Sequence, residues 1–372
     1  MNRLIAVFFI PVLLLVMACQ ENKNVTKKSV YFPAKIGDFW GLVDTSGNLI
    51  SQPVFSSIGY FYNGLALVTK DNKASYMNDS GKVIADYLFL SGTHFNEGLA
   101  FVVSTDHVIS CIDTSLNQKF SLKDIDHAEI FSCGLAAVHK LDKYGYLDKS
   151  GKMKIDFFYD VVTGFSDDIA AVGINDASAD SSIVNWFYID KNGNKLFDET
   201  FDSAIPFHEG KAAVQNNIKM YWIDKTGKKL FNAEFDECRS FHGGFATFRS
   251  GDKWGIIRAD GKIILEPSYP FVGNFSENFF PFSLGPESYG YLDTTGNIKI
   301  QPKYKAVSAF KNGFSYILQN AKLGILSKVG VETCYERFDS APGYFGAMLG
   351  FIDTPLNSSV DNYKSDSSII SQ

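Results

Sequence analysis

The chain has 372 residues, with 35 Lys and Arg against 41 Asp and Glu, which gives a formal net charge of -6. A mildly acidic chain without a basic block is poorly suited to nucleic acid, so we expect no nucleic-acid partner. Because a single hydrophobic core stops growing beyond about 250–300 residues, a chain of this length must divide into domains or be built from repeats.

The N-terminal residues 1–18 have the pattern of an export signal. Arg3 precedes an apolar run over residues 4–17, which is too short to span a bilayer. The dipeptide Ala18-Cys19 then resembles the end of a bacterial lipobox, which would make Cys19 the lipid attachment site. The alternative is an ordinary secretory signal with a chance cysteine. Lipidation would hold the protein on a membrane, since each buried acyl CH₂ contributes about 0.8 kcal/mol.

Residues 19–29 are polar and lack hydrophobic periodicity, which predicts a flexible tether behind the lipidated cysteine. Gln20, rather than Asp, follows Cys19. By resemblance to enterobacterial sorting, this residue favours the outer membrane. We therefore expect a lipid-anchored protein of the cell envelope, with its periplasmic or surface orientation left open.

A unit of about 34 residues recurs over residues 30–340 and is the dominant feature of the sequence. Self-similarity at such a period indicates stacked or radially arranged units. Eight units have a turn glycine, and one unit carries Leu116 in its place. The turn glycines are Gly47, Gly81, Gly151, Gly193, Gly227, Gly261, Gly296 and Gly330.

Local signals within a unit predict three or four short strands. Asp44 stands three residues before Gly47, and the same spacing recurs in most units. Asp can accept hydrogen bonds from its own turn, and Gly allows the positive φ of a tight hairpin. A second strand follows the turn. We expect this strand to end at Pro53, Pro267 and Pro302 in their units, because proline has no N–H to donate to the hydrogen bonds of the sheet. Repeated short strands of this kind are typical of all-β folds.

Two aromatic positions recur, eight and fourteen residues after the turn glycine. One unit alone has too little core to fold, so its aromatic face must be covered by the next unit. A carbohydrate-binding platform is the alternative, although such a site would not need the same residue in every unit. The later stripe consists of Phe61, Phe95, Phe165, Phe207, Phe241, Phe275 and Phe310, with Phe131 one position further on.

The repeat resembles the WG-repeat (KWG-type) family, whose units open with K-W-G-Y-I-D-x-x-G and continue to F-x-E-G-L-A. Lys253-Trp254-Gly255 matches the opening, and Phe95-Asn96-Glu97-Gly98 matches the later part. The resemblance implies a bacterial, non-enzymatic repeat module without catalytic residues or cofactors. We expect about nine units of three to four antiparallel strands in a β-propeller-like array, with an open β-solenoid as the alternative.

Departures from the family pattern lie in two units, where Ile109-Ser110 and Ala74-Ser75 replace the Trp-Gly pair. Both units should still form strands, with irregular packing. A third departure is an insertion near residues 175–182, which could be a surface loop or part of a binding face.

Possible chemistry is limited to a few residue clusters. His208 and His242 are equivalent in neighbouring units, and His94 adjoins Phe95 on its other side. Imidazoles could bind a metal, but a repeat-surface role is the expectation, with no metal site. The Asp turns offer one carboxylate each, short of the 6–8 oxygen ligands of calcium, so hairpin chemistry explains them.

The cysteines Cys111, Cys133, Cys238 and Cys334 lie in different units, and their pairing is left open. Cys111 with Cys133 is the pair to test, and free buried thiols are the expectation. The C-terminal residues 341–372 are Ser- and Asp-rich towards their end and are expected to be partly disordered.

These observations favour a membrane-anchored scaffold that binds a protein partner in the cell envelope. The alternative is a module that binds a glycan or another cell-wall ligand. A hydrolase is the third class considered, but the repeated carboxylates do not form the one distinct pair that a glycosidase needs.

Overall fold

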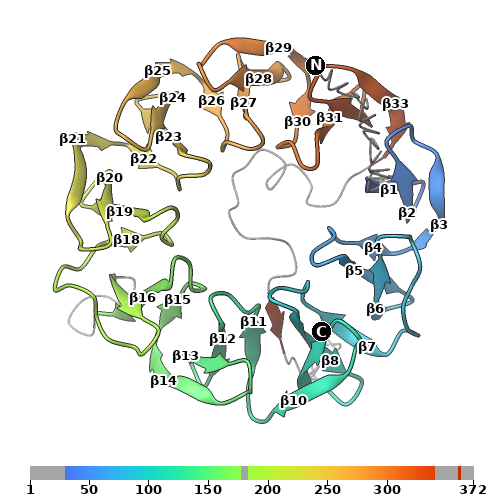
Figure 1. Ribbon diagram of the computed structural model, residues 1–372, viewed down its shortest axis with the longest axis horizontal. Coiled ribbons are helices and arrows are strands. Elements are labelled where there is room, and N and C mark those ends of the chain that lie inside the picture. Colours follow the sequence, from blue (N-terminus) through green and yellow to red (C-terminus); the bar gives the residue numbers. More distant parts are fainter. Residues whose placement is uncertain (1–29, 177–182, 340–358, 362–372) are drawn as a thin grey trace, which may run out of the picture.

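The computed structural model describes residues 30–176, 183–339 and 359–361. Short antiparallel strands surround a central opening in Figure 1. The described residues contain 34 strands and no helix, so none of their segments is a helix long and apolar enough to cross a membrane. The predicted signal, Cys19, the tether and most of the tail lie outside the described residues.

The described strands form nine units, which we number from the N-terminus. Unit 1 contains β1 (Tyr31–Ile36), β2 (Phe39–Asp44) and β3 (Leu49–Phe55). Unit 2 contains β4 (Ser57–Ile58), β5 (Leu65–Lys70) and β6 (Lys73–Asn78). Unit 3 contains β7 (Phe89–Gly92), β8 (Leu99–Ser104), β9 (Ile109–Asp113) and β10 (Gln118–Leu122). Unit 4 contains β11 (His127–Glu129), β12 (Leu135–Lys140), β13 (Lys143–Asp148) and β14 (Met153–Tyr159). Unit 5 contains β15 (Val161–Val162), β16 (Ile169–Asn175) and β17 (Val184–Asp190). Unit 6 contains β18 (Ser203–Ala204), β19 (Lys211–Asn216), β20 (Lys219–Asp224) and β21 (Lys229–Phe235). Unit 7 contains β22 (Glu237–Cys238), β23 (Phe245–Ser250), β24 (Lys253–Arg258) and β25 (Ile263–Tyr269). Unit 8 contains β26 (Phe271–Val272), β27 (Phe279–Ser283), β28 (Tyr289–Asp293) and β29 (Ile298–Tyr304). Unit 9 contains β30 (Ala306–Val307), β31 (Phe314–Gln319), β32 (Lys322–Ser327) and β33 (Glu332–Phe338).

A complete unit is a small antiparallel sheet that runs from a short inner strand to a longer outer strand. Unit 1 lacks the short inner strand, so β1, β2 and β3 take the second, third and fourth places, and units 2 and 5 lack the outer strand. The order β22-β23-β24-β25 is typical. Unit 2, one of the two departures noted in the sequence, is irregular: β6 pairs with β7 and joins units 2 and 3 into a seven-stranded sheet. The predicted all-β, propeller-like repeat array is confirmed.

The Asp and Gly residues of the repeat build the hairpin between the third and fourth strands. The Asp44 carboxylate accepts hydrogen bonds from the backbone N–H groups of Ser46 at 2.8 Å and Asn48 at 2.9 Å. Gly47 has φ 79°, which an L-residue rarely adopts. Leu116 takes the same conformation with φ 64°, and its side chain packs on the neighbouring apolar cluster.

The prolines do not end the outer strands as the sequence suggested. Pro53, Pro267 and Pro302 lie inside β3, β25 and β29. These strands tolerate proline because they form the outer edge of their sheets, and the register shifts between the pairs Ile256–Leu265 and Trp254–Tyr269. The same shift explains the glycine of the Trp-Gly pair, since a Cβ on Gly255 would lie 2.6 Å from the Leu265 carbonyl oxygen.

The cores lie between neighbouring units. Phe95, Phe131, Phe165, Phe207, Phe241 and Phe310 of the later stripe are buried, as predicted from the need to cover each unit. The Tyr146 ring packs against Phe165 of the next unit at 4.8 Å, and its hydroxyl donates to the Thr163 carbonyl oxygen at 2.8 Å. Tyr76, Tyr188, Trp222 and Tyr291 make the same contact with the residue seventeen positions ahead.

The first and last units are in contact. The Asp339 N–H donates to the Lys35 carbonyl oxygen at 2.8 Å, and the Gly37 N–H donates to the Asp339 carboxylate at 2.8 Å. Asp236 makes the same two bonds within the array, with Arg249 and Gly251. In this structure the two ends of the array therefore meet through the contacts that join successive units elsewhere.

One further strand belongs to the C-terminal segment. β34 (Ser359–Asp361) pairs with the inner edge of β11, with Val360 opposite Ala128. The predicted tail, residues 341–372, otherwise lies outside the described residues.

Candidate functional site

The ring has two faces, because successive hairpins of an antiparallel sheet lie at opposite ends of its strands. Face A carries the turns between first and second strands, such as residues 97–98, together with the Asp-x-x-Gly turns. Face B carries the turns between second and third strands, such as residues 141–142, and the connections from one unit to the next.

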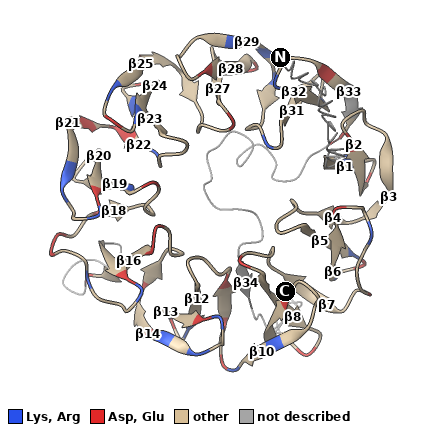
Figure 2. Cartoon of the chain, in the orientation of Figure 1, with Lys and Arg blue, Asp and Glu red and all other residues tan. Residues whose placement is uncertain are grey.

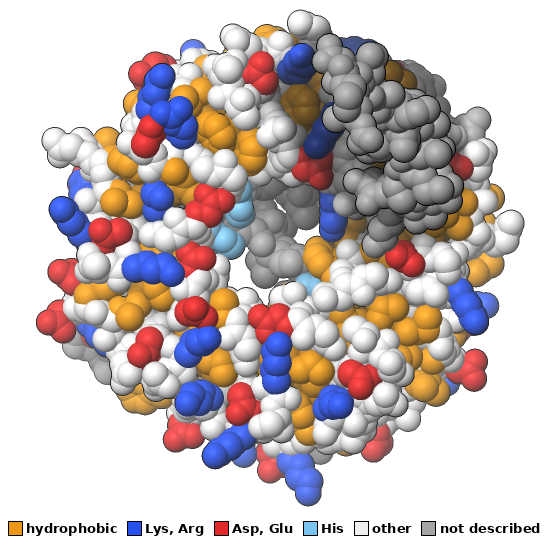
Figure 3. All heavy atoms as spheres, viewed as in Figure 1, with side chains coloured by type: hydrophobic (Ala, Val, Ile, Leu, Met, Phe, Trp, Pro, Cys, Tyr) orange, Lys and Arg blue, Asp and Glu red, His pale blue; other side chains and the backbone are white. Residues whose placement is uncertain are grey.

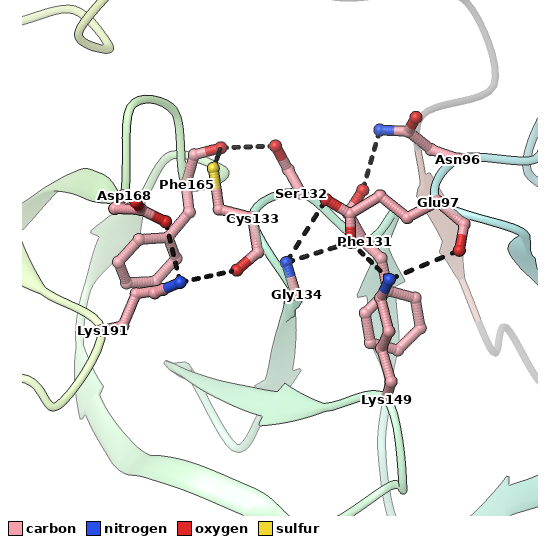
Figure 4. Close-up of polar contacts among 10 residues, drawn as sticks. All are labelled: Asn96, Glu97, Phe131, Ser132, Cys133, Gly134, Lys149, Phe165, Asp168 and Lys191. Carbon is pink, nitrogen blue, oxygen red and sulfur yellow. Dashed lines mark hydrogen bonds and ion pairs between the residues drawn. The ribbon is translucent and has the colours of Figure 1, made fainter.

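On face A, an acidic residue of one unit holds the turn of the next. Glu97 and Gly98 form a two-residue turn with φ 50° and 84°, which directs the Glu97 side chain towards unit 4. Its carboxylate accepts a hydrogen bond from the Gly134 N–H at 3.0 Å and pairs with the Lys149 ammonium at 2.9 Å (Figure 4). The family's E-G pair is thus a bridge between units.

The same bridge recurs around face A. Glu277 accepts hydrogen bonds from the N–H groups of Asn312 at 2.7 Å and Gly313 at 2.9 Å, and it pairs with Lys328 at 2.7 Å. Burial alone would raise the pKa of this carboxyl, but Lys328 and the two N–H groups lower it overall. The corresponding acids accept backbone hydrogen bonds in the same way. The Asp167 carboxylate accepts one from the Gly210 N–H, and the Glu209 carboxylate accepts one each from the N–H groups of Gly243 and Gly244. These carboxylates therefore stabilise the contacts between neighbouring units.

A second link on face A uses the side chain after the stripe phenylalanine. The Asn96 amide donates to the Phe131 carbonyl oxygen at 2.9 Å, and the Ser132 hydroxyl donates to the Phe165 carbonyl oxygen at 2.5 Å (Figure 4). Ser276 bonds to Phe310 in the same way. These contacts join residues more than thirty positions apart, so the spacing of a single unit did not reveal them.

The expected repeat-surface role is wrong for His94, which is buried, and His208 and His242 are half-buried. His208 and His242 have ring centroids 5.0 Å apart, whereas His94 is buried against Tyr62, with ring centroids 4.1 Å apart. Figure 3 shows histidine side chains at the edge of the central opening. Among the residues that the structure describes, no three His, Cys, Asp or Glu side chains form a group that could hold a metal ion.

The thiols of Cys111, Cys133 and Cys238 are free, so the pair left open by the sequence is not formed. Burial raises the pKa of Cys111 to about 12. Cys133 takes the place of the bridging acid in its unit, and its Sγ lies 3.7 Å from the Phe165 carbonyl oxygen (Figure 4). The Cys334 side chain is outside the described part.

An aromatic cluster at the inner edge was not identified from the sequence. The Lys311 ammonium lies 4.5 Å from the centre of the Tyr62 ring and 4.8 Å from that of Tyr60. Burial raises the pKa of Tyr60 to about 12. Lys311 belongs to unit 9 and the tyrosines to unit 2, so this cluster spans the place where the ends of the array meet. The sequence feature that could have indicated this cluster is Lys311 itself, because the residue after the stripe phenylalanine is Asn, Ser, His or Tyr in the other units.

On face B, aspartates join neighbouring units. The Asp160 carboxylate pairs with Lys143 of the preceding unit at 2.7 Å and accepts from the Asn175 N–H at 2.9 Å. Asp236 repeats this pattern with Lys219 at 2.5 Å and with Gly251. Basic and acidic residues are interspersed around the ring in Figure 2, and no large region of one sign is seen among the described residues drawn there.

Face B also presents exposed aliphatic side chains at its turns. Leu141 and Ile218 are 80% and 81% exposed. In unit 5, β16 ends at Asn175 and β17 begins at Val184, both on face B, and residues 177–182 of the insertion lie outside the described residues. Ile183, directly before β17, is exposed.

A known repeat family matches much of the chain in sequence. The family described as WG containing repeat matches residues 40–73, 144–176, 186–219, 222–254, 254–285 and 289–322. No curated protein matches the chain in sequence.

Among solved structures, the crystal structure of a eukaryotic initiation factor superposes with a TM-score of 0.60 at 13% identity. The match covers 84% of this chain and 97% of that one. BamB from Moraxella catarrhalis matches with a TM-score of 0.41 at 12% identity, covering 82% and 94%. At such identities the likeness to the initiation factor concerns the fold alone. With more than half of its residues matched by the repeat family, the chain belongs to the WG-containing-repeat proteins.

Proposed function

We propose that this protein is a lipid-anchored bacterial lipoprotein whose ring of WG repeats is a non-enzymatic scaffold for a protein partner in the cell envelope. The observation that carries the proposal is that the charged residues repeated from unit to unit join neighbouring units. Glu97, Glu277, Asp160 and Asp236 each bridge two units. A ring held at successive junctions forms a rigid platform, and the side chains that vary from unit to unit are left at its turns.

The proposed anchor also orients the ring. β1 runs from Tyr31 to the Gly37 turn of face B, so the chain enters on the side of face A. The eleven residues 19–29 can span at most roughly 37–40 Å when fully extended. Attachment of Cys19 to the outer membrane would therefore keep the side of face A near the anchor and leave face B accessible to a partner.

A glycan or cell-wall ligand is the second candidate, and the cluster of Tyr60, Tyr62 and Lys311 is the observation that favours it. These two tyrosines are half-buried and lie outside both repeated aromatic positions. Aromatic faces and a cation could contact a sugar that carries an anionic group.

Cross-linking of the native lipidated protein in intact cells, followed by mass spectrometry, separates the two candidates. A scaffold predicts one or two envelope proteins that are recovered from the wild type and lost from a Cys19→Ala control. If no protein is recovered and the chain sediments with purified cell-wall material, the scaffold proposal is wrong. Loss of that sedimentation in Tyr62→Ala would then assign binding to the aromatic cluster.

A further inference from the structure

The turn between β12 and β13 breaks a local rule of the repeat. It consists of Leu141 and Asp142, with φ 49° and 65°. Positive φ at the first residue of a two-residue hairpin favours Gly, Asn and Asp, since other L-residues are strained there. The equivalent residues of the other described two-residue turns follow the rule: Gly37, Asp71, Asn217, Gly251 and Asn320.

Leu141 is also unfavourable in its exposure. Its side chain is 80% exposed, so little packing offsets the strained backbone. Leu116 provides the contrast, because it has a similar φ but packs against an apolar cluster. A residue that violates two local preferences without a visible structural gain points to a functional role.

Neighbouring units extend the same feature. Ile218 is 81% exposed in the equivalent turn of unit 6, and Ile183 is 51% exposed directly before β17 in unit 5. Units 4, 5 and 6 are consecutive in the ring (Figure 1). We call Leu141, Ile183 and Ile218 the aliphatic arc. It places three aliphatic side chains on face B, the face that the proposed anchor leaves accessible.

Three lysines beside the aliphatic arc are paired with aspartates within the protein. Lys143 pairs with Asp160 at 2.7 Å, and Lys219 pairs with Asp236 at 2.5 Å. Lys140 lies 4.0 Å from Asp124. There is no surplus of basic groups in these pairs to attract an anionic membrane, whereas aliphatic residues among neutralised charges suit a protein surface.

We propose that the aliphatic arc is the docking site for a folded protein partner that has apolar pockets for Leu141 and Ile218. This inference rests on the proposed scaffold function and adds the face and the residues. The partner is recognised by apolar contact, with the paired charges around the arc forming a polar rim.

The first test uses a photo-cross-linking amino acid in the full lipidated protein in cells. It replaces Leu141 or Ile218, and in matched controls Asp71 or Asn320 at the equivalent turns, or Val329, which is 85% exposed on face A. We expect the same single protein to be cross-linked from positions 141 and 218 and from none of the controls. Cross-linking only from position 329 would overturn the aliphatic arc but leave the scaffold standing. The absence of a protein adduct at all five positions would overturn both.

The second test titrates the purified partner against the full chain carrying Leu141→Asn. We expect binding to weaken by about thirtyfold or more, which corresponds to the loss of one hot-spot contact. The thermal midpoint should stay equal or rise, because Asn relieves the strained turn, so loss of binding would not reflect unfolding. Unchanged affinity would refute the proposal. Binding of the wild type to anionic phospholipid vesicles that is lost in Leu141→Asn would assign the arc to a membrane instead.

Discussion

The bridge at Glu277 can be tested by removing its carboxylate. Glu277→Ala eliminates two hydrogen bonds from backbone N–H groups, at 2.7 and 2.9 Å, and the ion pair with Lys328. A buried hydrogen bond to a charged group contributes about 1.5–3 kcal/mol. The Glu277 and Lys328 side chains are 29% and 37% exposed, so water replaces part of this contribution. We expect a loss of about 2 kcal/mol in the free energy of unfolding.

Urea unfolding at pH 7 measures this loss, and Lys328→Met is the matched control. An exposed ion pair contributes only about 0.2–1 kcal/mol, so the control should be clearly milder. A loss below about 0.5 kcal/mol in Glu277→Ala, or an equal loss in both variants, would show that the N–H contacts do not hold the units together.

The pH dependence of the Glu277 bridge follows from the lowered pKa of Glu277. Its stabilisation is present above the ordinary pKa of a glutamate, near 4.3, and is lost as the pH falls through the lower pKa of the folded state. The difference between wild type and Glu277→Gln should therefore shrink in acid. A difference in urea midpoint that is the same at pH 7 and in strong acid would contradict this assignment.

Three other changes test the ring at separate points. Gly255→Ala places a Cβ 2.6 Å from the Leu265 carbonyl oxygen, so we expect a loss of about 1–3 kcal/mol by urea unfolding, and an unchanged midpoint would refute the close approach. Tyr291→Phe removes the hydroxyl that donates to the Ser308 carbonyl oxygen at 2.6 Å, which should cost about 1–3 kcal/mol; a neutral effect would mean that this link contributes nothing. Cys111, with its pKa raised to about 12, should resist maleimide at pH 8 until the protein unfolds, and rapid labelling of the native protein would disprove its burial.

The repeat could be predicted from the sequence because its signals are local. Asp44 and Gly47 lie within one turn, and the chemistry of that turn does not depend on the rest of the chain. The stripe phenylalanines follow from the need to cover each unit. The prolines were misread, since their tolerance depends on the position of β25 at the edge of its sheet, which only the order of the strands reveals.

The candidate site was harder to predict because it depends on contacts between units. Glu97 meets Gly134 of the next unit, and Gly37 meets Asp339 from the other end of the array. Leu141 lies outside the family's recognisable motifs. It becomes conspicuous only when its turn is aligned with those at Asn217 and Asn320 and its positive φ is known.

The meeting of the first and last units is the central claim about the architecture. Spin labels in the full chain at Phe39 of unit 1 and Ala321 of unit 9 test it by their separation, since Phe39 begins β2 next to the Gly37 turn and Ala321 lies in the turn between β31 and β32, both exposed on face B. The reference pair is Ile218 with Asp252, in the equivalent turns of the consecutive units 6 and 7. A ring predicts similar separations for the two pairs. If the labels at 39 and 321 are far apart while the reference pair is close, the array is an open rod and the account of the seam is wrong.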